Sequence, residues 1–169
     1  AHDRQRYETF GLSFAASDGS AMRGRLEKSF DHFVDIENMD ETQAAHFLRD
    51  NEIDIAVDLK GFTQDARTDI FAHRCAPVQV NYLGFPGTMG APYIDYLIAD
   101  RTIIPEDAQR HYSEKIVYLP DCYQPNDRRR QIAATTPPRA AHGLPDSGFV
   151  FCSFNNNYKV TPDIFDIWM

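Results

Sequence analysis

The segment IDIAVDLKG, residues 53–61, decides the fold class of this chain. Its first seven residues are mostly apolar and β-branched, as a buried strand requires, and its last residues form a polar turn at Gly61. A second segment of the same kind, VQVNYLGFPGT at residues 78–88, follows after one short stretch with helical periodicity. A strand, a glycine-containing loop, a helix and another strand are typical of parallel βαβ units.

The same alternation continues on both sides of these two segments. Further strands are expected at residues 7–14, 32–36, 94–99 and 115–119, and helices at residues 21–30, 40–51, 68–74 and 105–111. Asp40 and Gln43 have the spacing of a capping box at the start of the second helix. We therefore predict an α/β protein with a Rossmann-like parallel sheet that helices cover on both faces.

The regular pattern stops after residue 120. Residues 121–147 contain four prolines and little periodic hydrophobicity, which is typical of a linker. Order is expected to return with a buried strand at residues 148–154 (GFVFCSF), followed by a helix that Thr161 and Pro162 open. The predicted organisation is one lobe at residues 1–120, an inter-lobe linker at 121–147, and the first strand and helix of a second lobe at 148–169.

Composition excludes several classes of protein. A formal net charge of −8 argues against broad binding of nucleic acid, and we interpret the run Arg128-Arg129-Arg130 as a solvated part of the linker. No apolar run is long enough to span a bilayer, so no membrane partner is expected. The three cysteines lack zinc-ligand spacing and are odd in number, which favours reduced thiols and a cytoplasmic location. The chain starts without Met and ends inside an expected helix, so we expect a piece of a longer protein.

Three loops occupy the place where open α/β sheets bind ligands, beyond the carboxyl ends of strands. The first carries the carboxylate of Asp58, the ammonium group of Lys60 and the hydroxyl of Thr63. The second, residues 83–88, has glycines that let a ligand approach backbone N–H groups. In the third, residues 155–159, a lysine precedes the amino end of a helix, which suits a diphosphate.

Each of these features also has a purely structural interpretation. Glycine-containing turns between strands and helices commonly bind nothing, Asp58 can cap the helix that follows it, and a lone Lys159 is more often a solvated surface residue. Neither a Ser/His/Asp set nor an HExxH, Walker A or GxGxxG motif is present. The residue pattern by itself therefore leaves the function open.

Three stretches of sequence resemble a known family in the family's own order. VDLKGFTQDARTDIFAHRCAPVQVNYLGFPGTMGAPYIDYLIAD (57–100), YSEKIVYLPDCYQPND (112–127) and FCSFNNNYKVTPDIFDIWM (151–169) are similar to the catalytic region of the O-GlcNAc transferase and SPINDLY family. The strings APVQVNYLGFPGT and SFNNNYKVTP are long and unusual. The resemblance covers most of the chain and is weakest in the N-terminal third and the linker.

The resemblance implies a partial GT-B glycosyltransferase, with the end of the N-terminal lobe and the start of the C-terminal lobe. Such enzymes move a sugar from a nucleotide diphosphate to Ser or Thr of proteins, invert the anomeric centre and use no metal or other cofactor. The expected donor is UDP-GlcNAc, although the wider family also uses UDP-glucose and GDP-fucose. Tetratricopeptide repeats are expected upstream in the parent protein.

The resemblance also implies roles for particular residues. Lys159 matches the lysine that neutralises the leaving diphosphate, with Tyr158 as its neighbour, and Asp58 is a candidate carboxylate near the acceptor. The candidate substrate-binding residues are Lys60, Thr63, Leu83, Gly84, Pro86, Thr88, Asn155 and Asn156. The family's upstream base candidate would precede Ala1, and Phe62 stands where some relatives carry a histidine. The base that activates the acceptor is thus unassigned.

Two other functions remain open at this stage. A transferase lobe can serve as a non-catalytic interaction module, and a GT-B enzyme can use a small molecule or a glycan as acceptor. Because the second lobe stops after its first expected helix, we predict that residues 1–169 alone do not turn over sugar nucleotide.

Overall fold

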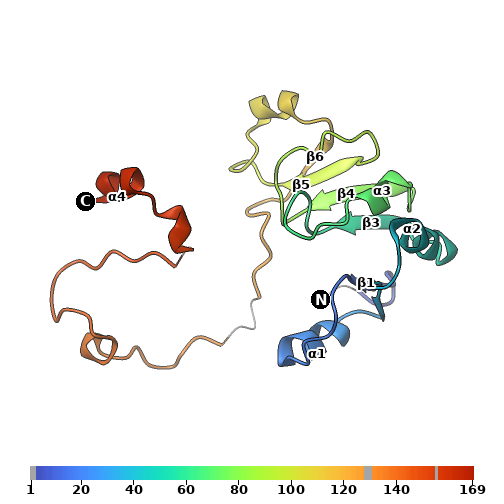
Figure 1. Ribbon diagram of the computed structural model, residues 1–169. Coiled ribbons are helices and arrows are strands. Elements are labelled where there is room, and N and C mark those ends of the chain that lie inside the picture. The colour runs from blue at the N-terminus through green and yellow to red at the C-terminus, as the bar shows by residue number, and fades with distance from the viewer. Residues whose placement is uncertain (1–2, 128–130, 155) are drawn as a thin grey trace. The chain divides into compact units, whose positions relative to one another are not determined.

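The computed structural model describes residues 3–127, 131–154 and 156–169. The chain divides into two compact units, Ala1–Asn126 and Asp127–Met169. All strands that the structure assigns in the described residues belong to the first unit (Figure 1).

The strands of the first unit form two parallel sheets. β1 (Phe10–Ser13) pairs with β2 (His32–Asp35). The larger sheet has the order β3-β4-β5-β6, formed by β3 (Ile55–Asp58), β4 (Val78–Tyr82), β5 (Tyr96–Ala99) and β6 (Lys115–Tyr118). Every neighbouring pair is parallel, so the predicted α/β, Rossmann-like fold class is confirmed.

Helices connect these strands, and most begin where the sequence predicts. They are α1 (Ala21–Glu27), α2 (Glu41–Asp50), α3 (Asp69–Ala72) and the 3-10 helix η1 (Glu106–His111). The capping box of α2 is confirmed: the Gln43 backbone N–H donates to Asp40, and the Asp40 N–H donates to the Gln43 side chain. Such a cap stabilises a helix by about 1 kcal/mol.

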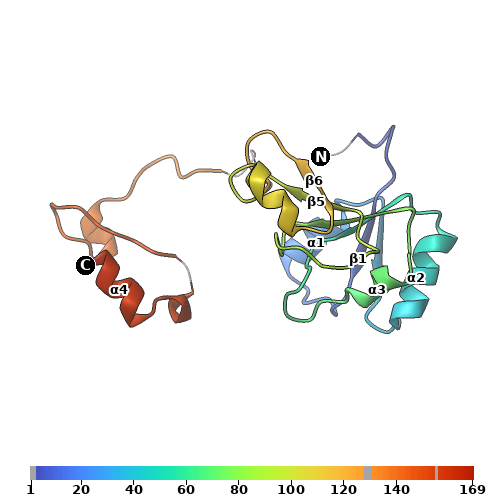
Figure 2. The same ribbon diagram turned by 90° about the horizontal axis from the view of Figure 1, so that it is seen from above.

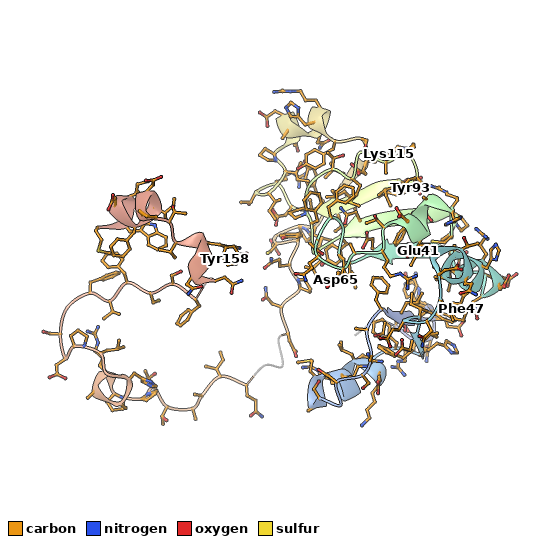
Figure 3. The ribbon with its side chains drawn as sticks, in the orientation of Figure 1. Glu41, Phe47, Asp65, Tyr93, Lys115 and Tyr158 are labelled. Atoms are coloured by element: carbon orange, nitrogen blue, oxygen red, sulfur yellow. The ribbon has the colours of Figure 1, made fainter. Side chains whose placement is uncertain are left out.

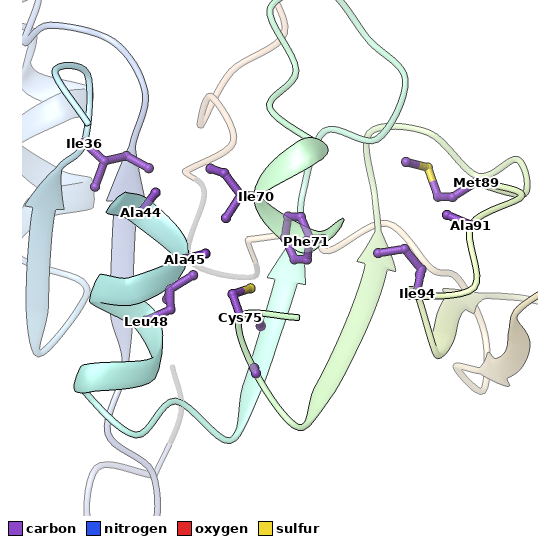
Figure 4. Close-up of a cluster of buried hydrophobic side chains, with 12 residues drawn as sticks. Ile36, Ala44, Ala45, Leu48, Ile70, Phe71, Cys75, Met89, Ala91 and Ile94 are labelled. Carbon is purple, nitrogen blue, oxygen red and sulfur yellow. The ribbon is translucent and has the colours of Figure 1, made fainter. Parts of the chain in front are cut away.

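The main core lies between α2, α3 and residues 89–94. Ala44, Ala45 and Leu48 of α2 face Ile70 and Phe71 of α3, and these side chains share one buried cluster with others shown in Figure 4. α2 and α3 lie side by side, as Figure 2 also shows. A second cluster contains Leu97, Ala99 and Ile104 and packs against half-buried side chains of η1 and β6.

The prediction that helices cover both faces of the sheet is wrong for the described part of the chain. Side chains on β3 alternate: Ala56 and Asp58 are buried, whereas Ile55 and Val57 are 58% and 43% exposed. Val117 on β6 lies on the same face and is 42% exposed, whereas Val80 of the inner strand β4 lies on this face and is buried. The reason is that the helical packing of this unit falls on the face that carries Ala56.

The predicted linker begins inside the first unit. Tyr123 is buried, its backbone N–H donates to Asp100 at 2.8 Å, and its carbonyl accepts from the Tyr82 hydroxyl at 2.6 Å. Hydrogen bonds from the Tyr123, Ile103 and Thr102 backbone N–H groups hold the pKa of Asp100 below its usual value. Residues 121–126 therefore pack as part of the α/β unit rather than as a free connection.

The second unit contains short helices. These are the 3-10 helices η2 (Arg139–His142) and η3 (Asn157–Lys159), and α4 (Pro162–Trp168), which Thr161 caps as predicted. The strand expected at residues 148–154 is wrong: no strand is assigned there, and Phe149, Phe151 and Phe154 are exposed. A strand needs a neighbour for its backbone N–H and C=O groups, and the described residues of this unit supply none. No helix in the described residues is long and apolar enough to cross a membrane.

Candidate functional site

Two adjacent strands end in buried polar side chains. Asp58 ends β3, Asn81 lies opposite it on β4, and their exposed fractions are 5% and 0%. Parallel register places both at the carboxyl edge of the sheet, where open α/β sheets bind ligands. The residues that follow form two loops, which we name the β3 loop (residues 59–63) and the β4 loop (residues 83–88).

Each of these side chains builds the loop that follows its own strand. Asp58 Oδ1 accepts hydrogen bonds from the backbone N–H groups of Lys60 at 2.9 Å and Gly61 at 3.1 Å. Asn81 Nδ2 donates to the carbonyls of Phe85 at 2.9 Å and Gly87 at 3.4 Å. The conformation of each loop is therefore fixed by a side chain of the strand that precedes it.

Each side chain also keeps one oxygen without a partner. Within the described residues, Asp58 Oδ2 and Asn81 Oδ1 are buried and accept no hydrogen bond. A buried acceptor without a donor costs about 1–3 kcal/mol. Folded proteins rarely keep such groups without a reason, so this edge of the sheet has unused capacity to accept hydrogen bonds.

The two loops pack against each other through their glycines. A Cβ on Gly84 would lie 2.5 Å from the Leu59 carbonyl oxygen, and one on Gly61 would lie 2.6 Å from Phe85 Cβ. Gly61 also has a φ of 57°, which favours glycine. The Phe62 and Phe85 rings meet edge to face at 5.6 Å across the two loops. The loops therefore form one rigid pair.

Leu83 begins the β4 loop in a strained conformation. Its φ of 78° lies in the left-handed region, which costs a non-glycine residue about 1–2 kcal/mol. Strain of this kind persists where the surroundings impose it, and it clusters at functional sites.

The far end of the β4 loop is fastened by the residues before β6. The Tyr112 hydroxyl donates to the Pro86 carbonyl at 3.2 Å. The Thr88 hydroxyl lies 2.7 Å from Glu114 Oε2, and the Met89 N–H donates to Glu114 Oε1 at 2.6 Å. Sequence reasoning missed both Glu114 and Asn81. A polar residue inside the apolar run VQVNY was the available signal for Asn81, and Glu114 had none beyond its place before a strand.

The structure brings together the candidate residues of the first unit. Six of them lie on the β3 and β4 loops, next to Asp58 at this edge: Lys60, Thr63, Leu83, Gly84, Pro86 and Thr88. Thr63 ends the β3 loop and is exposed. The structure shows Asp58 in a structural role, as the sequence allowed, but it caps the turn of the β3 loop rather than a helix, and its role near an acceptor stays a prediction. The Thr88 hydroxyl is occupied by protein partners.

The candidates of the second unit are exposed. Asn156 and Lys159 are exposed, and Tyr158, labelled in Figure 3, is 75% exposed. Lys159 ends η3, three residues before α4 begins. Asn155 lies outside the described residues. The diphosphate contact of Lys159 stays a prediction.

A shallow concavity of about 490 Å³ lies at the opposite edge of the sheet, away from both loops. It is lined by residues before β3 and β4, including Arg74 and Cys75. Arg74 is already paired with Asp95 at 2.9 Å. Burial raises the pKa of Asp95, but hydrogen bonds from the Gln79 N–H and Arg74 outweigh burial and lower it. Because ligands of parallel sheets bind at the carboxyl edge, we favour the loop pair as the site.

No metal cluster accompanies the loop pair. In residues 3–127, 131–154 and 156–169, no group of three or more His, Cys, Asp or Glu side chains could hold a metal ion.

Comparison with known proteins places the chain in a family. Residues 1–136 match the family described as glycosyl transferase family 41. Over 99% of its length the chain is 39% identical to an Arabidopsis thaliana protein named probable UDP-N-acetylglucosamine–peptide N-acetylglucosaminyltransferase SEC, and 34% identical to the Arabidopsis protein named SPINDLY. It is 35% identical over 80% of its length to a Caenorhabditis elegans UDP-N-acetylglucosamine–peptide N-acetylglucosaminyltransferase.

A solved structure agrees with these relatives. The chain matches a variant of the Thermobaculum terrenum O-GlcNAc transferase with a TM-score of 0.82 and 30% identity, over 99% of this chain and 31% of that one. The chain spans 18% of the length of each Arabidopsis relative and 12% of the Caenorhabditis one. The family match covers most of the residues, including both loops, and the chain therefore belongs to glycosyl transferase family 41.

Proposed function

We propose that this chain forms part of the catalytic region of a transferase that moves GlcNAc from UDP-GlcNAc to Ser or Thr hydroxyls of proteins. The observation that carries the proposal is the rigid loop pair at the carboxyl ends of β3 and β4, in a chain of family 41. The names of the relatives give the donor as UDP-N-acetylglucosamine and the acceptor as a peptide.

The loop pair suits the sugar end of such a donor. Gly84 is exposed on the β4 loop, and Leu83 is held in a strained conformation beside it. Preorganised backbone lowers the entropy that a bound sugar must lose before it reacts. We assign Leu83, Gly84 and Pro86 to the sugar and acceptor side, with Lys60 and Thr63 at the rim of the same loops.

Lys159 supplies positive charge for the departure of the diphosphate. In an inverting transfer the acceptor oxygen attacks the anomeric carbon, the bond to the diphosphate oxygen breaks on the opposite side, and the acceptor proton passes to a base. The leaving diphosphate gains negative charge, and in a metal-free mechanism an ammonium group must meet it. Tyr158 and the amides of Asn155 and Asn156 are assigned to the nucleotide.

In this proposal Asp58 is the buried carboxylate at the end of β3, next to the loop pair. Its exposed fraction is 5%, so an acceptor hydroxyl reaches Oδ2 only if the β3 loop moves. We therefore assign Asp58 the task of holding that loop, and leave the base to a residue outside this chain.

The test uses the full parent protein, UDP-GlcNAc and a mixture of protein acceptors, with transfer followed as a mass increase. Lys159→Ala should lower the rate by about 100-fold or more, because the leaving charge is no longer neutralised. Lys28→Ala removes an exposed lysine of the first unit and should leave the rate unchanged.

Other outcomes separate the alternatives. Transfer from GDP-fucose only would contradict the donor, and neither transfer nor nucleotide binding by the parent protein would contradict the function and favour an interaction module. Residues 1–169 alone should show no turnover, and a detectable rate would contradict that part of the proposal.

A further inference from the structure

Glu114 is a buried acid with no cationic partner among the residues that the structure describes. Its exposed fraction is 5%, and no ion pair joins it to any described residue. Its carboxylate instead accepts two short hydrogen bonds, from the Met89 N–H at 2.6 Å and the Thr88 hydroxyl at 2.7 Å. Burying a carboxylate is unfavourable unless such bonds compensate, so the position of Glu114 depends on the end of the β4 loop.

The hydroxyl of Thr88 is saturated by this arrangement. It donates its one proton to Glu114 and accepts from the backbone N–H groups of Gly90 at 3.1 Å and Ser113 at 3.3 Å, and the Ser113 hydroxyl oxygen lies 3.2 Å from it as a further neighbour. A threonine hydroxyl has one donor and two acceptor positions, and all three are used here. Thr88 thus shapes the loop, and its hydroxyl has no position left for a ligand.

We propose that Glu114 is a positioning residue of the candidate sugar-nucleotide site, and that it acts through Thr88 and Met89 by fixing the end of the β4 loop. This inference rests on the proposed function. Asn81 holds the middle of the loop from β4, and Glu114 holds its far end from the residues before β6. With the middle and the far end of the loop fixed, Gly84 and Pro86 keep a single position relative to the β3 loop.

An amide at position 114 cannot replace the carboxylate. In Glu114→Gln, the side-chain oxygen still accepts from Met89, but the NH₂ group then faces a Thr88 oxygen whose acceptor positions are taken by Gly90 and Ser113. Two donors meet, and the loop end must shift. Glu114→Asp keeps the charge but is one methylene too short to reach both partners. Misplacement of about 1 Å can lower a rate by about 100-fold.

The experiment measures transfer kinetics in the full parent protein for Glu114→Gln, Thr88→Val and the double variant. Glu106→Gln is the matched control, because Glu106 is exposed and pairs with Arg101 at the surface. Assays are made at a temperature at which every variant is folded. We expect kcat to fall about 10-fold or more in each single variant, with the double variant no worse than the poorer single one, because both changes remove the same contact.

A second readout is independent of activity. Amide hydrogen exchange of the peptide that contains Met89 should accelerate in Glu114→Gln and stay at the wild-type rate in Glu106→Gln. Unchanged exchange, or losses in kcat that multiply in the double variant, would overturn the inference. If the wild-type parent transfers no sugar, the proposed function fails, and the exchange of Met89 still decides whether Glu114 holds the loop.

Discussion

Two stretches with similar sequence patterns differ in secondary structure in this molecule. VQVNY at residues 78–82 forms β4, which pairs on both sides and buries three of its five residues. GFVFCSF at residues 148–154 is equally apolar, yet it forms no strand and leaves Phe154 97% exposed. The difference teaches that a strand pattern is a conditional prediction: it becomes a strand only where neighbouring strands accept its backbone hydrogen bonds.

The same contrast applies to the candidate site. The residues of the first unit are held by specific contacts, such as those of Asp58, Asn81 and Glu114. Lys159 of the second unit is exposed at the end of a three-residue 3-10 helix. The candidate residues of the first unit are therefore preorganised, whereas Lys159 is not, and the following predictions test that difference.

Matched truncations in the two units should differ most. Leu97→Ala removes a fully buried side chain of β5 and should lower the free energy of unfolding by about 2–5 kcal/mol. Phe154→Ala removes an exposed ring and should change it by less than about 0.5 kcal/mol. Urea denaturation of residues 1–169 measures both, and a loss of 2 kcal/mol or more at Phe154 would contradict the contrast.

The glycine contact between the loops gives the next largest effect. Gly84→Ala places a Cβ against the Leu59 carbonyl and should cost about 1–3 kcal/mol of unfolding free energy. Gly24→Ala is the control, because that position in α1 is open and alanine should stabilise the helix by about 0.5–1 kcal/mol. The idea that the loops form one unit is wrong if Gly84→Ala is as stable as the wild type.

Acid should release residues 121–124 from the first unit. Backbone hydrogen bonds depress the pKa of Asp100, so its contribution is complete above the usual value of 3.8 and is lost as pH falls through the depressed pKa. The protection of the Tyr123 amide from hydrogen exchange, measured relative to the intrinsic rate at each pH, should fall over that acidic range. In Asp100→Asn, exchange should be fast already at pH 6, whereas Asp121→Asn, an exposed control, should behave as wild type.

Thiol reactivity compares the two units without perturbing the fold. Burial raises the pKa of Cys75 to about 11, so at pH 8 roughly 1 in 1,000 molecules carries the reactive thiolate there. Cys152 of the second unit is exposed. Alkylation followed by mass spectrometry should therefore modify Cys152 much faster than Cys75, and equal rates would show that the first unit opens readily.

Local sequence signals predicted much of the first unit. The capping box at Asp40 and Gln43 set the start of α2, and the glycines at 61 and 84 marked the loops that meet at the sheet edge. These features depend on neighbours in the chain or on one backbone conformation. The resemblance to family 41 then supplied functional roles that no spacing could give.

The features that sequence reasoning missed depend on distant partners. Glu114 meets Thr88 across a separation of 26 residues, and Tyr123 meets Asp100 across 23. The strand at 148–154 and the second covered face of the sheet failed for the same reason, because both depend on packing partners that an apolar pattern does not specify.

The most direct test of the central claim is hydrogen exchange of the full parent protein with and without UDP-GlcNAc. If the loop pair and Lys159 bind the donor, bound nucleotide sugar should protect peptides that cover residues 83–90 and 156–162, with a smaller effect at 58–63. Peptides of α1 and of residues 49–54 serve as internal controls and should not change. Protection elsewhere, with these loops unaffected by saturating donor, would contradict the account.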